Sequence, residues 1–366
     1  MKISAATLSG AHQIFENTQV EISEPVGDEV LIKISGVGLC HTDLAVQHGH
    51  LPFAFPGVVG HEGSGIVQAV GPETTGIRVG DRVGATFNSC GVCTQCVADK
   101  PSYCVEFMPR NFGGTRPDGS SPLSVDGQAL GSYFFGQSSF AAYAIARERN
   151  VVKLDDRIDL ELAGPLGCGI QTGAGAVMRS LPCTKGESLL VVGGGSVGLA
   201  AVLGAVVRQM ATIIVTEPLA TRRELALELG ATHVIDPSAG PVAEQVRKIL
   251  PEGVNYVVDT TASVGVLNDV IAAMSQRGML GMLGVPVDPS AELSLNLLEI
   301  QARGLSFKGI VEGDSDPKTF IPELVEHHLA GRFPFDRLIT KVPLMQINEA
   351  IEAQVRGDIL KAVLIP

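Results

Sequence analysis

The sequence has 366 residues, of which 45% are hydrophobic and 18% are charged, and its formal net charge is −12 at pH 7. This length exceeds one ordinary hydrophobic core and predicts about two domains. The negative charge argues against binding to nucleic acid or to an anionic membrane surface. No apolar run reaches the roughly 18 residues that span a bilayer, and the N-terminus lacks the apolar core of a secretory signal. We therefore expect a cytoplasmic protein.

Short strands separated by turns are predicted for the first 150 residues. The expected strands cover residues 30–35, 65–70, 82–86 and 141–145, with glycines recurring between them. This pattern is typical of an irregular, mostly β domain. Residues 111–132 are polar and rich in glycine, and they predict a surface loop.

From about residue 170 the predicted strands and helices alternate. We expect strands at residues 188–192, 212–216, 233–235, 254–259 and 279–283, and helices at 196–208, 221–229, 243–249 and 266–273. Such alternation predicts a parallel sheet covered by helices on both faces. The simplest organisation is a β-rich domain of residues 1–170 and 311–366, interrupted by an inserted α/β domain of residues 171–310.

A glycine motif opens the inserted domain. Gly193, Gly195 and Gly198 stand in G-x-G-x-x-G register between an expected strand and an expected helix. The first glycine permits a tight turn, the second a close approach of a pyrophosphate, and the third close packing of helix on strand. The helix N-terminus then offers free N–H groups to the phosphates. The context predicts a Rossmann dinucleotide site.

The charged residue that follows the next strand favours NAD over NADP. Glu217 comes nineteen positions after Gly198 and can accept hydrogen bonds from ribose hydroxyls, while it would repel a 2′-phosphate. Arg222 and Arg223 lie close by and weigh in the other direction, because an arginine can hold that phosphate.

Four cysteines lie within fifteen residues, as Cys90, Cys93, Cys96 and Cys104. Thiolates at this spacing can bind one tetrahedral ion, and four of them leave no open position for a substrate. We expect a structural zinc site; an iron–sulfur cluster is the competing interpretation. Three further candidates, Cys40, His61 and Cys168, are too far apart for spacing alone to join them.

The motifs together resemble the zinc-containing medium-chain dehydrogenase/reductase family, which includes alcohol dehydrogenases. The resemblance is carried, in order along nearly the whole chain, by GLCHTD at 38–43, GHEGSGIV at 60–67, the four-cysteine cluster and the glycine motif. FFGQSSFAAYA at 134–144 and GPLGCGIQTGAGA at 164–176 look like the branch of aryl-alcohol (benzyl alcohol) dehydrogenases. That branch also includes enzymes of allylic alcohols such as geraniol.

The resemblance implies a GroES-like catalytic domain joined to the Rossmann domain, two zinc ions per chain, and NAD. Cys40, His61 and Cys168 would bind the catalytic zinc, a ligand set that is a known example for alcohol dehydrogenase. Thr42 would bond the substrate oxygen, Asp43 would hold the ligand histidine, and Glu62 would lie beside the metal. The cofactor-binding residues would be His41, Thr172, Gly193, Gly195, Ser196, Val197, Gly198, Glu217, Arg222 and Lys361.

Two positions depart from the family pattern. The family's terminal relay histidine is replaced by the apolar pair Ala45 and Val46, so the last proton step falls to water, the ribose or a group such as His48. Lys361 stands where the family has an arginine for the pyrophosphate, and it keeps the charge but loses the bidentate geometry.

The expected substrate is a small apolar primary alcohol or its aldehyde. Phe87 and Phe140, with Leu51, Phe53 and Phe55, fall in segments that line the family's substrate cleft. The alternatives are a glutathione-dependent formaldehyde dehydrogenase, a general short-chain alcohol dehydrogenase, or a non-enzymatic zinc protein that senses NAD(H). Family members pair through an edge of the cofactor-domain sheet, so we expect a homo-oligomer, with residues 279–285 as the candidate edge strand.

Overall fold

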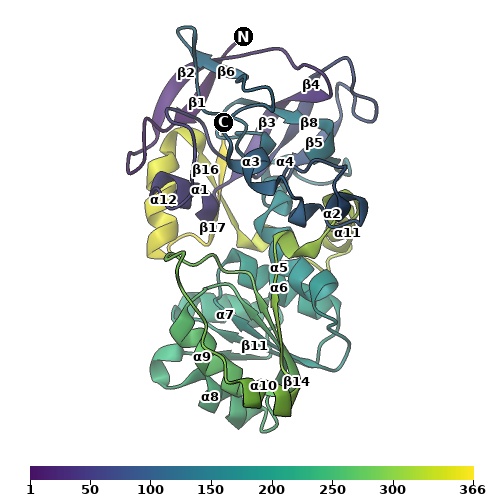
Figure 1. Cartoon of the computed structure of the whole chain (residues 1–366), viewed down its shortest axis with the longest axis vertical. Coiled ribbons are helices and arrows are strands. Elements are labelled where there is room, and N and C mark those ends of the chain that lie inside the picture. The colour runs from purple at the N-terminus through teal and green to yellow at the C-terminus, as the bar shows by residue number, and fades with distance from the viewer. The chain divides into compact units, whose positions relative to one another are not determined.

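The computed structural model describes residues 1–366, and the chain folds into two compact units. The first unit comprises residues 1–168, 316–329 and 336–366, and the second comprises residues 169–315 and 330–335. In Figure 1 the first unit runs through the purple, blue and yellow parts of the chain, and the second through the teal and green parts. None of the helices is both long enough and apolar enough to cross a membrane.

The first unit is built on two sheets. The larger has seven strands in the order β16-β17-β3-β4-β5-β9, with β8 paired to β3; the smaller has the order β1-β2-β6-β7. Only the pair β16 and β17 is parallel in the larger sheet. The strands are β1 (Lys2–Thr7), β2 (Glu16–Ile22), β3 (Glu29–Gly38), β4 (Gly63–Val70), β5 (Arg82–Ala85), β6 (Leu123–Val125), β7 (Gln128–Ala129), β8 (Tyr143–Arg147), β9 (Val151–Lys153), β16 (Ile339–Pro343) and β17 (Lys361–Ile365).

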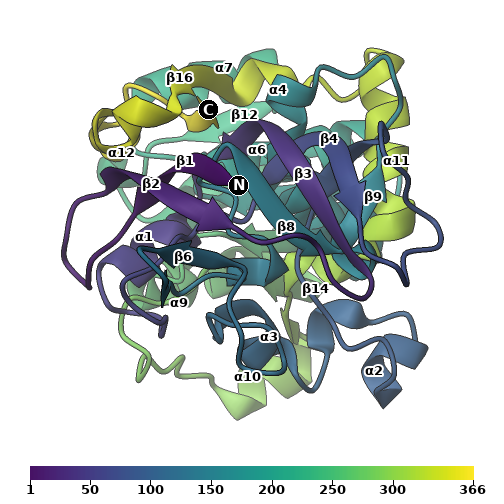
Figure 2. The same cartoon turned by 90° about the horizontal axis from the view of Figure 1, so that it is seen from above.

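Six helices belong to the first unit. They are α1 (His41–Gln47), α2 (Thr94–Val97), α3 (Phe107–Phe112), α4 (Leu160–Ala163), α11 (Pro317–Leu329) and α12 (Ile347–Arg356). Seen from above, the short helix α2 lies at the outer edge of the unit, whereas β3 and β8 run through its middle (Figure 2).

The central strand β3 positions the first candidate site. Its residues are almost all buried, because β3 pairs with β4, β8 and β17 at once. It ends at Gly38, two residues before Cys40, and a Cβ at Gly38 would lie 1.8 Å from Oε2 of Glu62. A larger residue at this position would therefore displace the buried carboxylate of Glu62.

The prediction of a simple surface loop over residues 111–132 is wrong in part. This segment contains the end of α3 and the hairpin of β6 and β7, and β6 pairs with β2 through Ile22 and Leu123. Leu123 and Leu130 are buried. These few apolar side chains anchor a segment whose overall polarity and glycine content predict exposure.

The second unit is a parallel sheet of the Rossmann type. Its strand order is β12-β11-β10-β13-β14-β15, and every pair is parallel. Numbered from β10, this is the strand order 3-2-1-4-5-6 of the Rossmann fold. The chain adds β11 and β12 on one side of β10, then returns and adds β13, β14 and β15 on the other side. The strands are β10 (Ser188–Val192), β11 (Thr212–Thr216), β12 (His233–Ile235), β13 (Val254–Asp259), β14 (Met274–Met282) and β15 (Ser306–Gly309), and the helices are α5 (Gly169–Gly175), α6 (Ser196–Val207), α7 (Ala220–Glu228), α8 (Val242–Ile249), α9 (Val264–Ala273) and α10 (Leu297–Arg303).

The expected alternation of strands and helices is confirmed, and β10 to β13 have the predicted bounds. The candidate edge strand at residues 279–285 is wrong, since β14 lies between β13 and β15. The two edges are β12, at the predicted residues 233–235, and the short strand β15, which we did not predict. Its four residues are at most half-buried, so they lack the continuous apolar run that marks a buried parallel strand.

Candidate functional site

Cys40, His61, Glu62 and Cys168 form a compact group of possible metal ligands in the first unit. One ligand atom from each lies within 4.8 Å of the others. Cys40 precedes α1, His61 and Glu62 precede β4, and Cys168 follows the short helical turn Gly164–Gly167. The fold thus brings together residues whose spacing in the sequence did not predict a common site.

The donors of this group fit a zinc ion. Nδ1 of His61 lies 2.9 Å from Oδ1 of Asp43, while its Nε2 is buried and has no hydrogen-bond partner. A buried ring nitrogen without a partner is costly, and a metal held with two thiolates would satisfy it. Asp43 also accepts hydrogen bonds from the N–H groups of Cys40, at 2.9 Å, and Gly60, at 3.1 Å.

The charges around this group favour the ligand form of the thiol. A hydrogen bond from Cys168 and the charge of His61 lower the pKa of Cys40 well below its usual value, although burial opposes this shift. Burial also lowers the pKa of His61, but the negative charges of Asp43 and Cys40 outweigh it and raise this pKa well above its usual range. Thiolate is the form of cysteine that binds metals.

Glu62 forms a buried ion pair beside these ligands. Its Oε2 lies 2.6 Å from Nζ of Lys361, and Nζ also donates to the carbonyl oxygen of Leu39 at 2.9 Å. Burial raises the pKa of Glu62, whereas the charge of Glu62 raises that of Lys361 despite burial. The ammonium predicted to contact a pyrophosphate is therefore turned inward in the structure, because Lys361 opens β17 next to the end of β3.

Aromatic rings pack against the imidazole of His61. The ring of Phe135 stacks on it with centroids 4.4 Å apart, and Phe134 meets it edge-on at 5.5 Å. Phe112 contacts both phenylalanines. Sequence reasoning missed Phe134 and Phe135 as neighbours of the site, although the motif FFGQSSFAAYA contains them.

The phenylalanines that the sequence did single out lie in different places. The rings around His61, those of Phe112, Phe134 and Phe135, form one aromatic group. Phe53 contacts Phe134 of this group, with centroids 5.4 Å apart. Phe87 has no ring contact with the group itself, but it packs against Phe107, which contacts Phe135. Phe140 is fully buried and packs edge-on against Phe15 at 5.7 Å. Its ring lies in the hydrophobic core of the unit and has no ring contact with this aromatic group.

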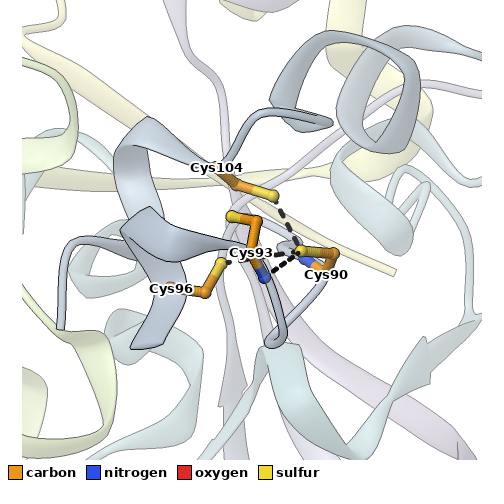
Figure 3. A group of neighbouring side chains, drawn as sticks. All are labelled: Cys90, Cys93, Cys96 and Cys104. Carbon is orange, nitrogen blue, oxygen red and sulfur yellow. Dashed lines mark hydrogen bonds between the residues drawn. The ribbon is translucent and has the colours of Figure 1, made fainter. Parts of the chain in front are cut away.

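Cys90, Cys93, Cys96 and Cys104 form a second group, and their sulfurs also lie within 4.8 Å of one another. Figure 3 shows the four side chains turned toward a common centre. The backbone N–H of Cys90 donates to the sulfur of Cys104 at 3.2 Å, and that of Cys93 donates to the sulfur of Cys90 at 3.3 Å. Hydrogen bonds from Val105 and Cys96 lower the pKa of Cys93 to about 6. This donor set fits a closed tetrahedral metal site.

The glycine turn of the second unit has the geometry expected of a pyrophosphate site. Gly193 has a φ of +95°, and a Cβ at Gly198 would lie 1.9 Å from the carbonyl oxygen of Gly193. A Cβ at Gly195 would meet nothing within 4 Å, so there is open space at the point where a phosphate would approach. Helix α6 begins directly after it with Ser196 and Val197.

Glu217 is buried at the end of β11, where its carboxylate is held by backbone. It accepts hydrogen bonds from the N–H groups of Gly194, at 2.8 Å, and Leu219, at 3.0 Å. Arg223 donates to the carbonyl oxygens of Glu217 and Pro218 and pairs with Asp236 at 3.1 Å. Its charge is thus already engaged within the protein.

The remaining predicted residues lie near their expected segments. His41 is exposed at the first position of α1, and the hydroxyl of Thr42 lies 3.7 Å from the sulfur of Cys40. Arg222 is half-buried on α7. In the second unit, the hydroxyl of Thr172 lies 3.3 Å from Oε2 of Glu312.

Comparisons with known proteins agree along the chain. Two family descriptions match: "Alcohol dehydrogenase GroES-like domain" over residues 27–156 and "Zinc-binding dehydrogenase" over residues 196–326. Geraniol dehydrogenase of Castellaniella defragrans is 48% identical over 348 residues, which cover 94% of this chain and 93% of that protein. S-(hydroxymethyl)glutathione dehydrogenase of Candida maltosa is 32% identical over 94% of this chain and 92% of its own length.

A solved structure extends this likeness to the whole fold. The crystal structure of benzyl alcohol dehydrogenase from Acinetobacter calcoaceticus superimposes with a TM-score of 0.96 and 40% identity, covering 100% of this chain and 99% of that one.

Proposed function

Because this chain belongs to the zinc-dependent alcohol dehydrogenases of the medium-chain dehydrogenase/reductase family, we propose that it oxidises an aryl or allylic primary alcohol to the aldehyde with NAD as hydride acceptor. The observation that carries the proposal is the group of Cys40, His61 and Cys168, in which a buried imidazole nitrogen lacks a partner. Three protein ligands leave one position of a tetrahedral zinc open to a substrate oxygen.

Each residue around this group has a role in the proposal. Cys40, His61 and Cys168 hold the catalytic zinc, and zinc in such a site acts as a Lewis acid that lowers the pKa of the alcohol. Asp43 fixes the imidazole in the tautomer that leaves Nε2 free for the metal. Glu62 balances the charge of Lys361 beside the ligands.

Thr42 accepts the substrate proton and passes it on. The next acceptor is not Ala45 or Val46, because both are buried apolar side chains. Water, the cofactor ribose and His48, which is exposed directly after α1, are the three candidates.

A structural zinc completes the metal content. Cys90, Cys93, Cys96 and Cys104 hold this second ion, which gives two zinc ions per chain. A four-thiolate site closes the loop around α2 and has no position for a substrate.

The second unit binds NAD in this proposal. The pyrophosphate binds next to Gly195 and the N-terminus of α6, and the carboxylate of Glu217 accepts hydrogen bonds from the ribose hydroxyls. The other proposed cofactor contacts are His41, Thr172, Ser196, Val197, Arg222 and Lys361. We assign residues 171–310 to the cofactor domain, and residues 1–170 with 311–366 to the catalytic domain.

The aromatic group supports a flat, apolar substrate. Phe53, Phe134 and Phe135 form a continuous set of ring contacts that reaches His61. Apolar walls suit a benzylic or allylic alcohol better than a sugar. The two relatives named for geraniol and benzyl alcohol support the same substrate class.

The assembly and location are also proposals. Two copies would pair along the edge strand β15; the segment between β14 and β15, which includes α10, exposes the apolar side chains of Val285, Val287, Leu297 and Leu298. None of the seven cysteines forms a disulfide, and thiols that bind zinc must stay reduced. This supports a cytoplasmic location, where disulfides are rare.

A rate survey with NAD over benzyl alcohol, geraniol, ethanol and S-(hydroxymethyl)glutathione tests the proposal, together with zinc quantification. We expect the highest kcat/KM for benzyl alcohol or geraniol and two zinc ions per chain. A preference for the glutathione adduct would favour the alternative that the Candida maltosa relative represents. Cys40→Ser should abolish turnover; an NAD(H) sensor would have no turnover to lose.

A further inference from the structure

We propose that Gln137 and Thr86 are positioning residues that fasten the His61 segment to the Cys168 segment and so keep the metal ligands together. The proposal rests on the proposed function, because it concerns the residues that would hold the catalytic zinc. Neither side chain is one of the ligands, and both are almost completely buried in the first unit.

Gln137 binds the backbone on both sides of Glu62. Its Nε2 donates to the carbonyl oxygen of His61 at 2.8 Å, and its Oε1 accepts the N–H of Gly63 at 3.0 Å. One side-chain amide thus makes the two hydrogen bonds that a neighbouring strand would make. The backbone that carries His61 and Glu62 is held in place by a residue more than seventy positions away.

Thr86 continues this connection to the other ligand segment. Its carbonyl oxygen accepts a second hydrogen bond from Nε2 of Gln137 at 3.3 Å, and its hydroxyl donates to the carbonyl oxygen of Gly167 at 2.7 Å. Gly167 is the residue before Cys168, and a Cβ there would lie 2.0 Å from the carbonyl oxygen of Ala85. The Cys168 segment is therefore packed directly against the end of β5.

The turn that presents Gln137 has a strained backbone. Tyr133, Phe135 and Ser138 have φ values of +62°, +52° and +53°, in the left-handed region that non-glycine residues rarely occupy. Such strain persists only where surrounding contacts fix the conformation. Two of these contacts are with the His61 segment: the ring of Phe135 stacks on the imidazole, and Oγ of Ser138 donates to the carbonyl oxygen of Val58 at 2.6 Å.

Loss of this connection should loosen the metal site. Replacing Gln137 by an apolar side chain leaves the carbonyl of His61 and the N–H of Gly63 without their buried partners. Unpaired buried polar groups are costly, so this loss favours conformations in which the segment shifts to find new hydrogen bonds. Removing the groups that orient metal ligands typically weakens metal binding by about 10- to 100-fold.

The test measures zinc release from the folded holoenzyme to a chromophoric chelator, with residual turnover followed in parallel. We expect Gln137→Met to release one of its two zinc ions about tenfold faster than the wild type, with turnover lost at the same rate. The KM for NAD of the zinc-loaded enzyme should not change, because the glycine turn and Glu217 belong to the second unit. Thr86→Val, which replaces the hydroxyl by a methyl group and so removes the bond to Gly167, should accelerate the same release.

Asn348→Leu is the matched control. The amide of Asn348 also makes two hydrogen bonds to backbone, both with one residue: it accepts from the N–H of Phe15 at 3.1 Å and donates to its carbonyl oxygen at 2.9 Å. It contacts no ligand segment, so it should lower the melting temperature without accelerating zinc release.

Unchanged release in both Gln137→Met and Thr86→Val would overturn the proposal, as would equal acceleration in the control. If Gln137→Met does not fold, Thr86→Val alone decides. A wild-type enzyme that holds only the four-cysteine zinc would overturn the proposed function and this inference together, whereas normal release in the variants with two zinc ions bound overturns only the inference.

Discussion

At the scale of single residues, the orientation of one imidazole depends on one carboxylate. Asp43 accepts hydrogen bonds from Nδ1 of His61 and from the N–H groups of Cys40 and Gly60. In Asp43→Asn an amide NH2 group must face one of these donors. We expect zinc affinity at the catalytic site to fall by about 10- to 100-fold, as measured by competition with a chelator. Asp28→Asn, which removes a half-exposed partner of Arg147, is the control; equal zinc loss in both variants would contradict the role of Asp43.

A second carboxylate should decide which cofactor binds. Glu217 is buried, and its charge lies where the adenosine ribose of a dinucleotide is expected. Glu217→Ser removes a charged acceptor, and hydrogen bonds to charged groups contribute about 1.5–3 kcal/mol. The ratio of kcat/KM for NAD to that for NADP should therefore fall by roughly tenfold or more. Glu187→Gln, a half-buried change elsewhere in the same unit, should leave the ratio unaltered; an unchanged ratio in Glu217→Ser would place the ribose elsewhere.

At the scale of elements, a buried ion pair fixes the segment between α3 and β6. The guanidinium of Arg116 lies 2.7 Å and 2.9 Å from the two carboxylate oxygens of Glu29, and the hydroxyl of Tyr133 donates to the same carboxylate at 2.9 Å. Arg116→Met leaves Glu29 buried without its charge partner, which costs about 3–5 kcal/mol.

For Arg116→Met we expect a clear decrease in the midpoint of thermal unfolding. Arg147→Met breaks a half-exposed pair with Asp28 and should cost about 1 kcal/mol or less. If the two variants melt alike, the buried pair is not what holds this segment.

Local pattern predicted the second unit better than the first. Strands β10 to β13 could be placed to the residue, because buried parallel strands are short apolar runs bounded by turns. The turn around Phe135 could not be predicted, since its left-handed conformation comes from tertiary contacts and only Gly136 signals it in the sequence. The spacing of the four cysteines was enough to predict that they share one metal site. For Cys40, His61 and Cys168 only the resemblance to a family predicted a common site. The ion pair of Lys361 with Glu62 could not be predicted from either source, because it depends on how β17 is placed next to β3.

At the scale of the whole molecule, the free edge of the parallel sheet should determine assembly. Strand β15 lies at one edge of the sheet, and exposed edges pair with other chains unless they are covered. Leu297 and Leu298 of α10 are 81% and 73% exposed and adjacent in the chain. Contiguous exposed apolar surface marks an interaction site, and association through a sheet edge joins two copies by the same surface.

Leu297→Lys together with Leu298→Lys should therefore halve the mass in solution, measured by light scattering after gel filtration. Both side chains are exposed in the single chain, so the substitution removes no internal packing and the separated chain should keep its fold. Association would place four added ammonium groups in one apolar interface, and burial of unpaired charge is far costlier than the loss of two leucine contacts. Val355→Lys on α12, 72% exposed in the first unit, controls for a lysine on any apolar surface. An unchanged mass in the double variant, or a halved mass in the control, would move the interface away from β15.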